Sequence, residues 1–265
     1  MTTRTSSRNS VLWSIEGPDC PGTSYLMGTM HVRDRRAFNR WQQVIQKVET
    51  CEVFAAEIQI EQLKSLPRAL PAVEPLHRLL PVRKFQKLRR QLRKGAGIDI
   101  ESCDYLPPVL ILQLIDEALL ARDYPASLDE SLWDYAKMQG KELLGLETVD
   151  AQFDFLRQLN STFQVGQLLE VGSRWPRHRR QAMRMAALYE AEEIDRLYQS
   201  ARQGAGKIRK TLLLQRNEHM ARSLSGLLRS QTVFCAVGAA HLGGGKGLLR
   251  LLKKDGFKVK PVPPT

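Results

Sequence analysis

The stretch Leu26-Met27-Gly28-Thr29-Met30-His31 leads from a short apolar run to a glycine and, three residues later, to a histidine. The same pattern returns near the other end of the chain as Ala236-Val237-Gly238-Ala239-Ala240-His241. A glycine at the end of a strand permits a tight turn that a Cβ would obstruct, and the histidine then projects over the carboxyl end of the strand. Because two of the five histidines occupy this position, we predict that His31 and His241 share one functional site.

Both turns lie within patterns typical of a β-α-β unit. Short apolar runs bounded by turn residues predict strands, and apolar residues at helical spacing predict helices. The predicted strands are 11–15, 23–27, 52–58, 232–237 and 257–262, and the predicted helices beside the turns are 38–48 and 248–254. This recurrence indicates either an old duplication or convergence on one turn geometry. We therefore expect an α/β fold, with a compact mixed sheet built from N- and C-terminal β-(GxxH)-α-β units.

The middle of the chain reads as a large helical insertion, at about 61–230, between these two units. Helical periodicity covers most of it, and one short apolar run interrupts it as a further strand. The helical patterns are 67–95, 107–122, 127–140, 148–171 and 177–203, followed by a helix that ends near Leu227, and the strand is 143–147. We expect a single domain over 1–265, preceded by a disordered Ser/Thr/Arg-rich tail at 1–10.

Composition limits the class of protein. A chain of 265 residues that is 43% hydrophobic and 26% charged is typical of a globular protein. Its four cysteines form no C-x-x-C pair, which argues against a zinc ribbon or a disulfide framework and favours a reducing cytoplasm. No apolar signal core follows the first residues, and the longest apolar stretch, 109–121, contains polar side chains. We therefore expect a cytoplasmic protein without a membrane-spanning segment.

The net charge of +12 is concentrated in two basic segments, 83–94 and 174–184. The simplest interpretation is a pair of solvated helix faces. No aromatic stacking series and no nucleic-acid-binding motif accompanies them, so we do not expect nucleic acid as a partner. Peripheral contact with an anionic surface stays open, and the sequence does not assign a role to these segments.

A third group must accompany two imidazoles in a metal site, and Glu57 is the best candidate. It ends the predicted strand 52–58, one crossover after His31, so in a parallel sheet it reaches the same edge. An unpaired carboxylate there would be costly to bury and should meet a metal, an arginine or a proton. The alternative is a solvated glutamate at a strand end. We predict that His31, Glu57 and His241 bind a divalent metal ion.

Three further residues are candidates for the chemistry itself. Glu147 ends its own strand and is predicted to be the general base, with a second ligand or a partner of a ligating histidine as other roles. The alternative is that the segment around it simply opens a helix. Arg216 and Asn217 lie on a predicted helix as donors that could orient a carboxylate ligand or a developing oxyanion, or as ordinary surface residues. His219 should lie near solvent.

An ordered set of short motifs runs along the chain. They are Tyr25-Leu26-Met27-Gly28-Thr29-Met30-His31, Ala56-Glu57, Leu128-Asp129 with Gly140-Lys141, Gly145-Leu146-Glu147-Thr148, Arg216-Asn217 with Met220, and Val237-Gly238-Ala239-Ala240-His241-Leu242-Gly243. In this order they resemble the TraB/GumN family, which includes the TIKI metalloproteases and the pheromone-shutdown proteins. The resemblance covers about 11–262.

This resemblance implies a metal-dependent, peptidase-like site that uses both histidines and a glutamate, here His31, His241 and Glu57. It implies a compact α/β core with a helical insertion, and it favours manganese or cobalt as the divalent metal, with zinc as another candidate. The chain departs from many relatives in showing neither a signal peptide nor a membrane segment. Its second turn also reads Gly-Ala-Ala-His where Gly-Ala-Gly-His is commoner.

The sequence thus predicts a metal-dependent hydrolase that acts on a peptide or small amide, with water activated beside the metal. A non-catalytic protein that sequesters a peptide or ligand in the same cleft is the alternative. A third hypothesis makes the basic surface the main functional feature, as a partner of nucleic acid or an anionic membrane. The sequence specifies neither the substrate nor the oligomeric state.

Overall fold

The computed structural model describes residues 9–64, 74–157, 161–205 and 210–265. Within them the fold is mixed α/β, as predicted, and is organised around one sheet. The strands follow the predicted apolar runs to within a few residues at each end. They are β1 (Leu12–Glu16), β2 (Ser24–Thr29), β3 (Val53–Ala56), β4 (Glu142–Gly145), β5 (Val233–Gly238) and β6 (Lys258–Pro261).

The sheet has the order β4-β3-β5-β2-β1-β6. Strands β4, β3, β5 and β2 are parallel, whereas β1 is antiparallel to both β2 and β6. Strands β1 and β2 therefore form an antiparallel hairpin. Because β2 and β5 are neighbours in register, with Thr29 opposite Gly238, the two Gly-x-x-His turns leave the sheet side by side.

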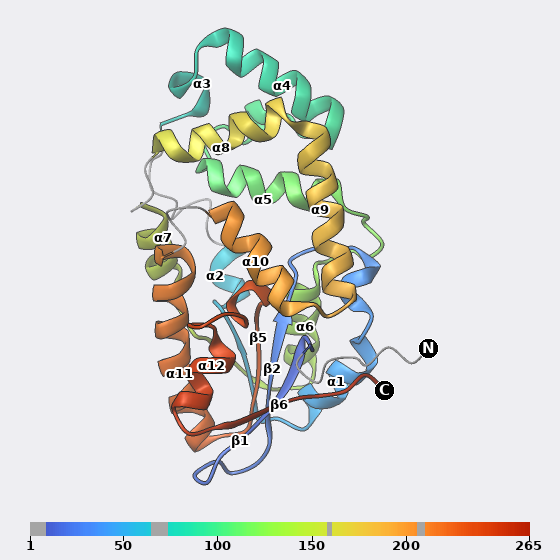
Figure 1. Cartoon of the computed structure of the whole chain (residues 1–265), viewed down its shortest axis with the longest axis vertical. Coiled ribbons are helices and arrows are strands. Elements are labelled where there is room, and N and C mark those ends of the chain that lie inside the picture. Colours follow the sequence, from blue (N-terminus) through green and yellow to red (C-terminus); the bar gives the residue numbers. More distant parts are fainter. Residues whose placement is uncertain (1–8, 65–73, 158–160, 206–209) are drawn as a thin grey trace.

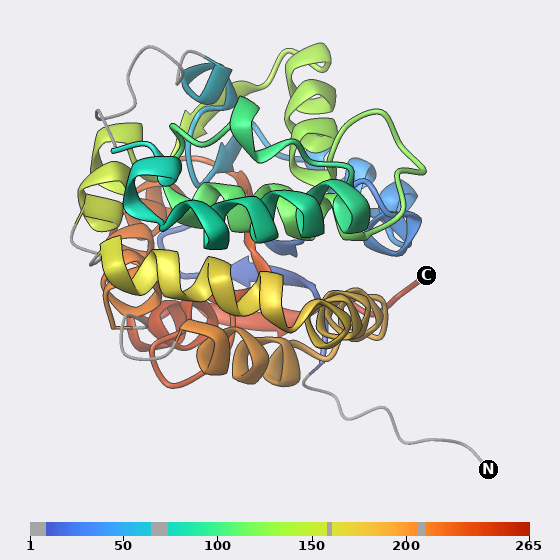
Figure 2. The ribbon, with the colours of Figure 1, turned by 90° about the horizontal axis from the view of Figure 1, so that it is seen from above.

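The two turns begin crossovers that run in opposite directions across the sheet. From β2, the chain passes through α1 (Trp41–Glu49) to β3, and from β5 it passes through α12 (Leu248–Lys254) to β6. Because parallel crossovers are right-handed, opposite directions place the connecting helices on opposite faces. Helix α1 packs with α6 (Leu128–Met138), and α12 packs with α11 (Arg216–Ser230). Figure 2 shows these two layers on either side of the strands.

The remaining helices lie mainly beyond the carboxyl ends of the parallel strands (Figure 1). The α-helices are α2 (Ile60–Lys64), α3 (Leu76–Leu79), α4 (Val82–Ala96), α5 (Pro108–Leu119), α7 (Val149–Arg157), α8 (Ser161–Ser173), α9 (Trp175–Glu190) and α10 (Ile194–Ala205). Short 3-10 turns are η1 (Arg35–Phe38), η3 (Ile100–Ser102) and η6 (Ala239–His241), and η5 (Lys210–Gln215) is a π-helical turn.

Three of the predicted helical patterns are divided in the structure. The pattern 67–95 becomes α3 and α4, with Leu80 and Pro81 between them. The pattern 177–203 is broken between α9 and α10 at Glu192, which has a φ of 55°. The pattern 148–171 becomes α7 and α8, and the residues between them, 158–160, lie outside the described part of the chain. The first part of the pattern 67–95 also lies outside it. Helical spacing identifies an apolar face but does not locate such interruptions.

The apolar side chains form two separate cores. The larger one surrounds the sheet, where the rings of Phe54 and Phe234 stack 5.7 Å apart. The smaller one is formed chiefly by α3, α4, α5 and α8, which we call the helical cap, with Leu92, Ile111 and Leu168 at its centre. Since the cap has its own core, it can stand over the sheet edge without filling the space between them.

Residues at both ends of the chain are held by one buried arginine. Arg40 pairs with Glu192 and donates hydrogen bonds to the hydroxyl of Ser10 and to the backbone oxygens of Val262 and Pro263. Ser10, which composition assigns to a disordered tail, is instead buried and hydrogen-bonded. Ser10 therefore belongs to the folded part of the chain, and residues 1–8 lie outside the described part.

Candidate functional site

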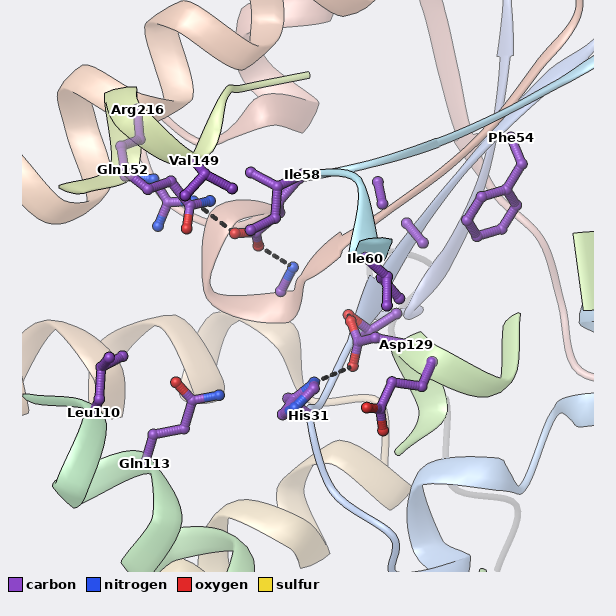
Figure 3. Close-up of a pocket in the computed structure, with 16 residues that line it drawn as sticks. His31, Phe54, Ile58, Ile60, Leu110, Gln113, Asp129, Val149, Gln152 and Arg216 are labelled. Carbon is purple, nitrogen blue, oxygen red and sulfur yellow. Dashed lines mark hydrogen bonds and ion pairs between the residues drawn. The ribbon is translucent and has the colours of Figure 1, made fainter. Parts of the chain in front are cut away.

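A cavity of about 530 Å³ lies where β2, β3 and β5 end beneath α5. His31 and Asp129 lie at one end of it and Arg216 at the other, while Gln113 of the helical cap faces them across the opening (Figure 3). Glu57 also lines this cavity. The parallel strands thus bring residues from distant parts of the sequence to one edge, as the sequence predicted for Glu57.

The two turns touch each other at the glycine of the first. A Cβ at Gly28 would lie 2.6 Å from Leu242 and 2.9 Å from the Cα of Ala239. A Cβ at Gly238 would lie 3.2 Å from Glu57 Oε1, although Gly238 has an ordinary φ of −54°. The second glycine therefore serves close approach by a carboxylate and not an unusual backbone conformation, which refines the reason given by the sequence.

Arg216 joins the two strand-end glutamates. Its guanidinium lies 2.6 Å from Glu57 Oε2 and 2.6 Å from Glu147 Oε2. Glu147 is fully buried and also accepts a hydrogen bond from Gln152. Burial alone would raise the pKa of Glu57, but Arg216, His241 and the Gly238 N–H together outweigh it and lower that pKa to about 2. Two carboxylates thus share one guanidinium in this buried cluster.

His241 is held in one tautomer by Asn217. The amide nitrogen of Asn217 donates to the backbone oxygen of Lys246, so its oxygen faces His241 Nδ1, 2.6 Å away. Nδ1 therefore carries the hydrogen, and Nε2 presents its lone pair. Burial, together with Arg216, lowers the pKa of His241 to about 4. The imidazole is thus neutral at pH 7, with Nε2 3.6 Å from Glu57 Oε1.

The contact between His241 Nε2 and Glu57 Oε1 is unfavourable unless a cation accompanies it. Glu57 Oε1 already accepts the Gly238 N–H and is ionised, so a second acceptor, the His241 lone pair, faces a negative oxygen. Imidazole nitrogen and carboxylate oxygen are suitable donors for a divalent transition metal. The residues on this side of the cavity therefore fit a metal ion.

His31 has different partners. Its Nε2 lies 3.4 Å from Glu117 of α5 and its Nδ1 3.4 Å from Asp129 of α6, and Ser127 lies 3.3 Å from Nδ1. Burial opposes the charge of His31, but Asp129 and then Glu117 raise its pKa to about 9. Asp129 Oδ2 is buried without a hydrogen bond of its own. His31 is therefore an imidazolium between two carboxylates.

The predicted residues thus form two groups around one cavity. Glu57, Glu147, Arg216, Asn217 and His241 are linked by direct contacts, whereas His31 contacts a separate acidic group. In the described residues, no cluster of three or more His, Cys, Asp or Glu side chains is arranged to hold a metal ion. Whether His31 joins Glu57 and His241 as a ligand stays a prediction. His219 is exposed, as expected.

Sequence reasoning did not identify the partners of His31. Ser127 and Glu130 form a capping box at the start of α6, a pattern that the sequence does contain. It places Asp129 in the first turn of α6, beside the cavity, where Thr29 donates to its Oδ1. Nothing in the sequence around Glu117 distinguishes it from other polar residues of an amphipathic helix.

The fold and the site together define a strand-edge cavity lined by carboxylates, an arginine and His31, with His241 in contact with the lining residue Glu57. The model of the TraB/PrgY/gumN family matches residues 11–261, and the chain belongs to this family. It is similar to metalloprotease TIKI2 of Danio rerio, with 26% identity over 97% of this chain and 61% of the relative. It is also similar to metalloprotease TIKI1 of the same organism, with 24% identity over 97% of this chain and 64% of the relative.

The chain spans less than two thirds of the length of either relative. No solved structure matches it significantly. Among the helices that the structure describes, none is both long and apolar enough to cross a membrane.

Proposed function

We propose that this protein is a metal-dependent peptidase whose divalent ion is held by His31, Glu57 and His241. The observation that carries the proposal is the lone pair of a neutral, buried His241 facing the ionised Glu57 across 3.6 Å. Family membership and the similarity to two proteins named as metalloproteases support it. Manganese and cobalt are the favoured metals, zinc is another candidate, and the cytoplasm is the expected location.

Each residue of the cluster has a distinct task in this proposal. Asn217 fixes the tautomer of His241, so that Nε2 is available as a donor. Arg216 holds Glu57 by one oxygen and leaves the other directed at His241. When bound, a divalent ion would polarise a substrate carbonyl and make water more acidic.

Glu147 is the residue whose role most needs testing. The sequence predicts a general base, but its carboxylate is fully buried and bonded to Arg216 and Gln152. We assign it a positioning role through Arg216, and a pH–rate profile distinguishes the two roles. A positioning role predicts that Glu147→Gln weakens metal binding without removing an ionisation from the profile. Loss of the acidic limb at unchanged metal affinity would establish the general base instead.

The lining of the cavity supports a peptide or small amide as the substrate class. Its walls carry the Arg216 guanidinium at one end and the Asp129 carboxylate at the other (Figure 3). A peptide or small amide offers carbonyl oxygens and N–H groups that suit these opposite ends.

The direct test is cleavage of a defined mixture of peptides, followed by mass spectrometry. The protein is first stripped with a chelator and then loaded separately with Mn²⁺, Co²⁺ or Zn²⁺. We expect metal-dependent products that Glu57→Gln and His241→Ala abolish. Arg222→Met is the matched control, because Arg222 is exposed on the same helix as Arg216. Absence of products with every ion, in a folded protein, would contradict the proposal.

The burial of Glu147 also favours a second candidate, a protein that binds a peptide in this cavity without cleaving it. In that case the same peptides would be retained by the loaded protein and recovered intact. Glu147→Gln would then leave their binding unchanged.

A further inference from the structure

A second, smaller cavity of about 180 Å³ adjoins the first at the two turns. Thr29 and Gly238, which pair in the sheet, line both cavities. Met30, Ala239 and Ala240 line the second cavity but not the first. The residues between the glycine and the histidine of each turn therefore face a space next to the candidate site.

The remaining walls of this second cavity are apolar. Met185 and Tyr189 come from α9, and Leu197 comes from α10. The Tyr189 hydroxyl donates to the backbone oxygen of Gly28 at 2.8 Å, which fixes the ring and uses its polar atom. Among the lining residues that the structure describes, none carries a charged side chain. Such a space favours a hydrocarbon group.

The size of the cavity limits what enters it. An apolar cavity of about 150 Å³ is large enough for benzene, so about 180 Å³ suits one side chain of the size of leucine, methionine or phenylalanine. Its walls are continuous with those of the first cavity at Thr29 and Gly238. A peptide bond presented to the first cavity would bring a neighbouring side chain to the second.

We propose that this second cavity, between the two turns and α9 and α10, is a specificity subsite for one apolar side chain of the peptide substrate. Met30 and Ala240, each directly before a histidine, set its shape. The inference rests on the proposed function for the identity of its occupant. The turns thus have two faces, one that supplies the histidines and one that selects a side chain.

The first experiment measures binding without turnover. Metal-free protein labelled with ¹³C at the methionine methyls is titrated with N-acetyl-leucinamide, and N-acetyl-alaninamide serves as the smaller probe. We expect the leucine compound to shift the Met30 and Met185 methyl signals and to leave Met138, which is 82% exposed, unmoved. Ala240→Leu should fill the cavity and abolish these shifts, whereas Ala121→Leu, at an exposed alanine, should not.

The second experiment measures selectivity by kcat/KM on metal-loaded protein. A single methylene in an apolar pocket changes kcat/KM by about 10–200-fold. Met185→Ala enlarges the cavity and should raise the preference for phenylalanine over leucine by about 10-fold. Met138→Ala is the matched control. Ala240→Leu should shift preference toward alanine, and thermal unfolding verifies that each variant is folded.

The outcomes separate this inference from the proposed function. Methyl shifts that Ala240→Leu abolishes, in a protein that cleaves no peptide with any metal, would support the apolar pocket and contradict the peptidase. Cleavage with an unchanged side-chain preference in both Ala240→Leu and Met185→Ala would overturn the subsite. Absence of any shift at Met30 and Met185 would overturn it as well.

Discussion

The two Gly-x-x-His turns share a spacing and end neighbouring parallel strands, but their histidines lie in opposite surroundings. The side chain of His241 is 7% exposed and faces the Asn217 amide and one carboxylate oxygen of Glu57. The side chain of His31 is 39% exposed and lies between Glu117 and Asp129. At pH 7, His241 is neutral and His31 is charged. Spacing places a histidine at the sheet edge, and its neighbours determine its protonation.

The surroundings of His241 and of His31 should differ most when a charge partner is removed from each. Arg216→Met would leave Glu57 and Glu147 without their cation in the interior, which should lower the free energy of unfolding by about 3–5 kcal/mol. Glu117→Gln removes a partner of the more exposed His31 and should cost at most about 1 kcal/mol. Urea unfolding of both variants measures the two values. Equal losses of unfolding free energy in the two variants would contradict the distinction between the buried surroundings of His241 and the more open surroundings of His31.

Removing the orienting groups should give a smaller effect in the same direction. Asn217→Ala leaves His241 Nδ1 and the Lys246 oxygen unsatisfied and should cost about 1–3 kcal/mol. It should also weaken binding of Zn²⁺ by about 10–100-fold, because His241 loses its fixed tautomer. Ser127→Ala, beside His31, removes the N-cap side chain of α6 and should cost about 1 kcal/mol. Calorimetric titration with Zn²⁺ tests the first variant, and retained affinity would refute the role of Asn217.

The pH dependence of stability should carry opposite contributions from the two histidines. The pKa of His241 falls from 6.5 to about 4 on folding, so its contribution is complete above pH 6.5 and is lost as the pH falls toward 4. The pKa of His31 rises to about 9, so its contribution is complete below pH 6.5 and is lost as the pH rises through 9.

Imidazole NMR titration of the metal-free protein tests this assignment directly. We expect His241 to stay neutral down to about pH 4 and His31 to stay charged up to about pH 9. His31→Gln should remove the alkaline loss of stability and leave the acidic loss unchanged. Identical titration curves for the two histidines would show that their surroundings are equivalent after all.

Much of the sheet could be predicted from the sequence because buried parallel strands are short continuous apolar runs between turn residues. Glu57 could be placed for the same reason, since the carboxyl ends of parallel strands share one edge. The sequence offered Arg216 as a donor that could orient a carboxylate ligand, but it did not specify that Arg216 bonds Glu57 and Glu147 together. This bonding depends on how α11 rotates when Met220 and Leu224 pack into the core, and periodicity does not give that orientation relative to the sheet.

The helical cap shows the same limit on a larger scale. The spacing of Phe85, Leu88 and Leu92 identifies the buried face of α4, but it does not show that this face packs within a separate core over the site. Glu117 reaches His31 only because α5 belongs to that cap. Contacts between separately packed layers depend on the tertiary arrangement, which the pattern of a single segment does not predict.

The central claim, that the two turns supply one metal site, is tested most directly by metal stoichiometry. Protein stripped with a chelator is re-equilibrated with Co²⁺, Mn²⁺ or Zn²⁺, desalted and analysed by plasma mass spectrometry. We expect about one ion per chain in the wild type and in Arg222→Met, and loss of that ion in His31→Ala, His241→Ala and Glu57→Gln alike. Retention of the ion in folded His31→Ala would contradict a shared site, because Glu57 and His241 would then bind the ion without His31.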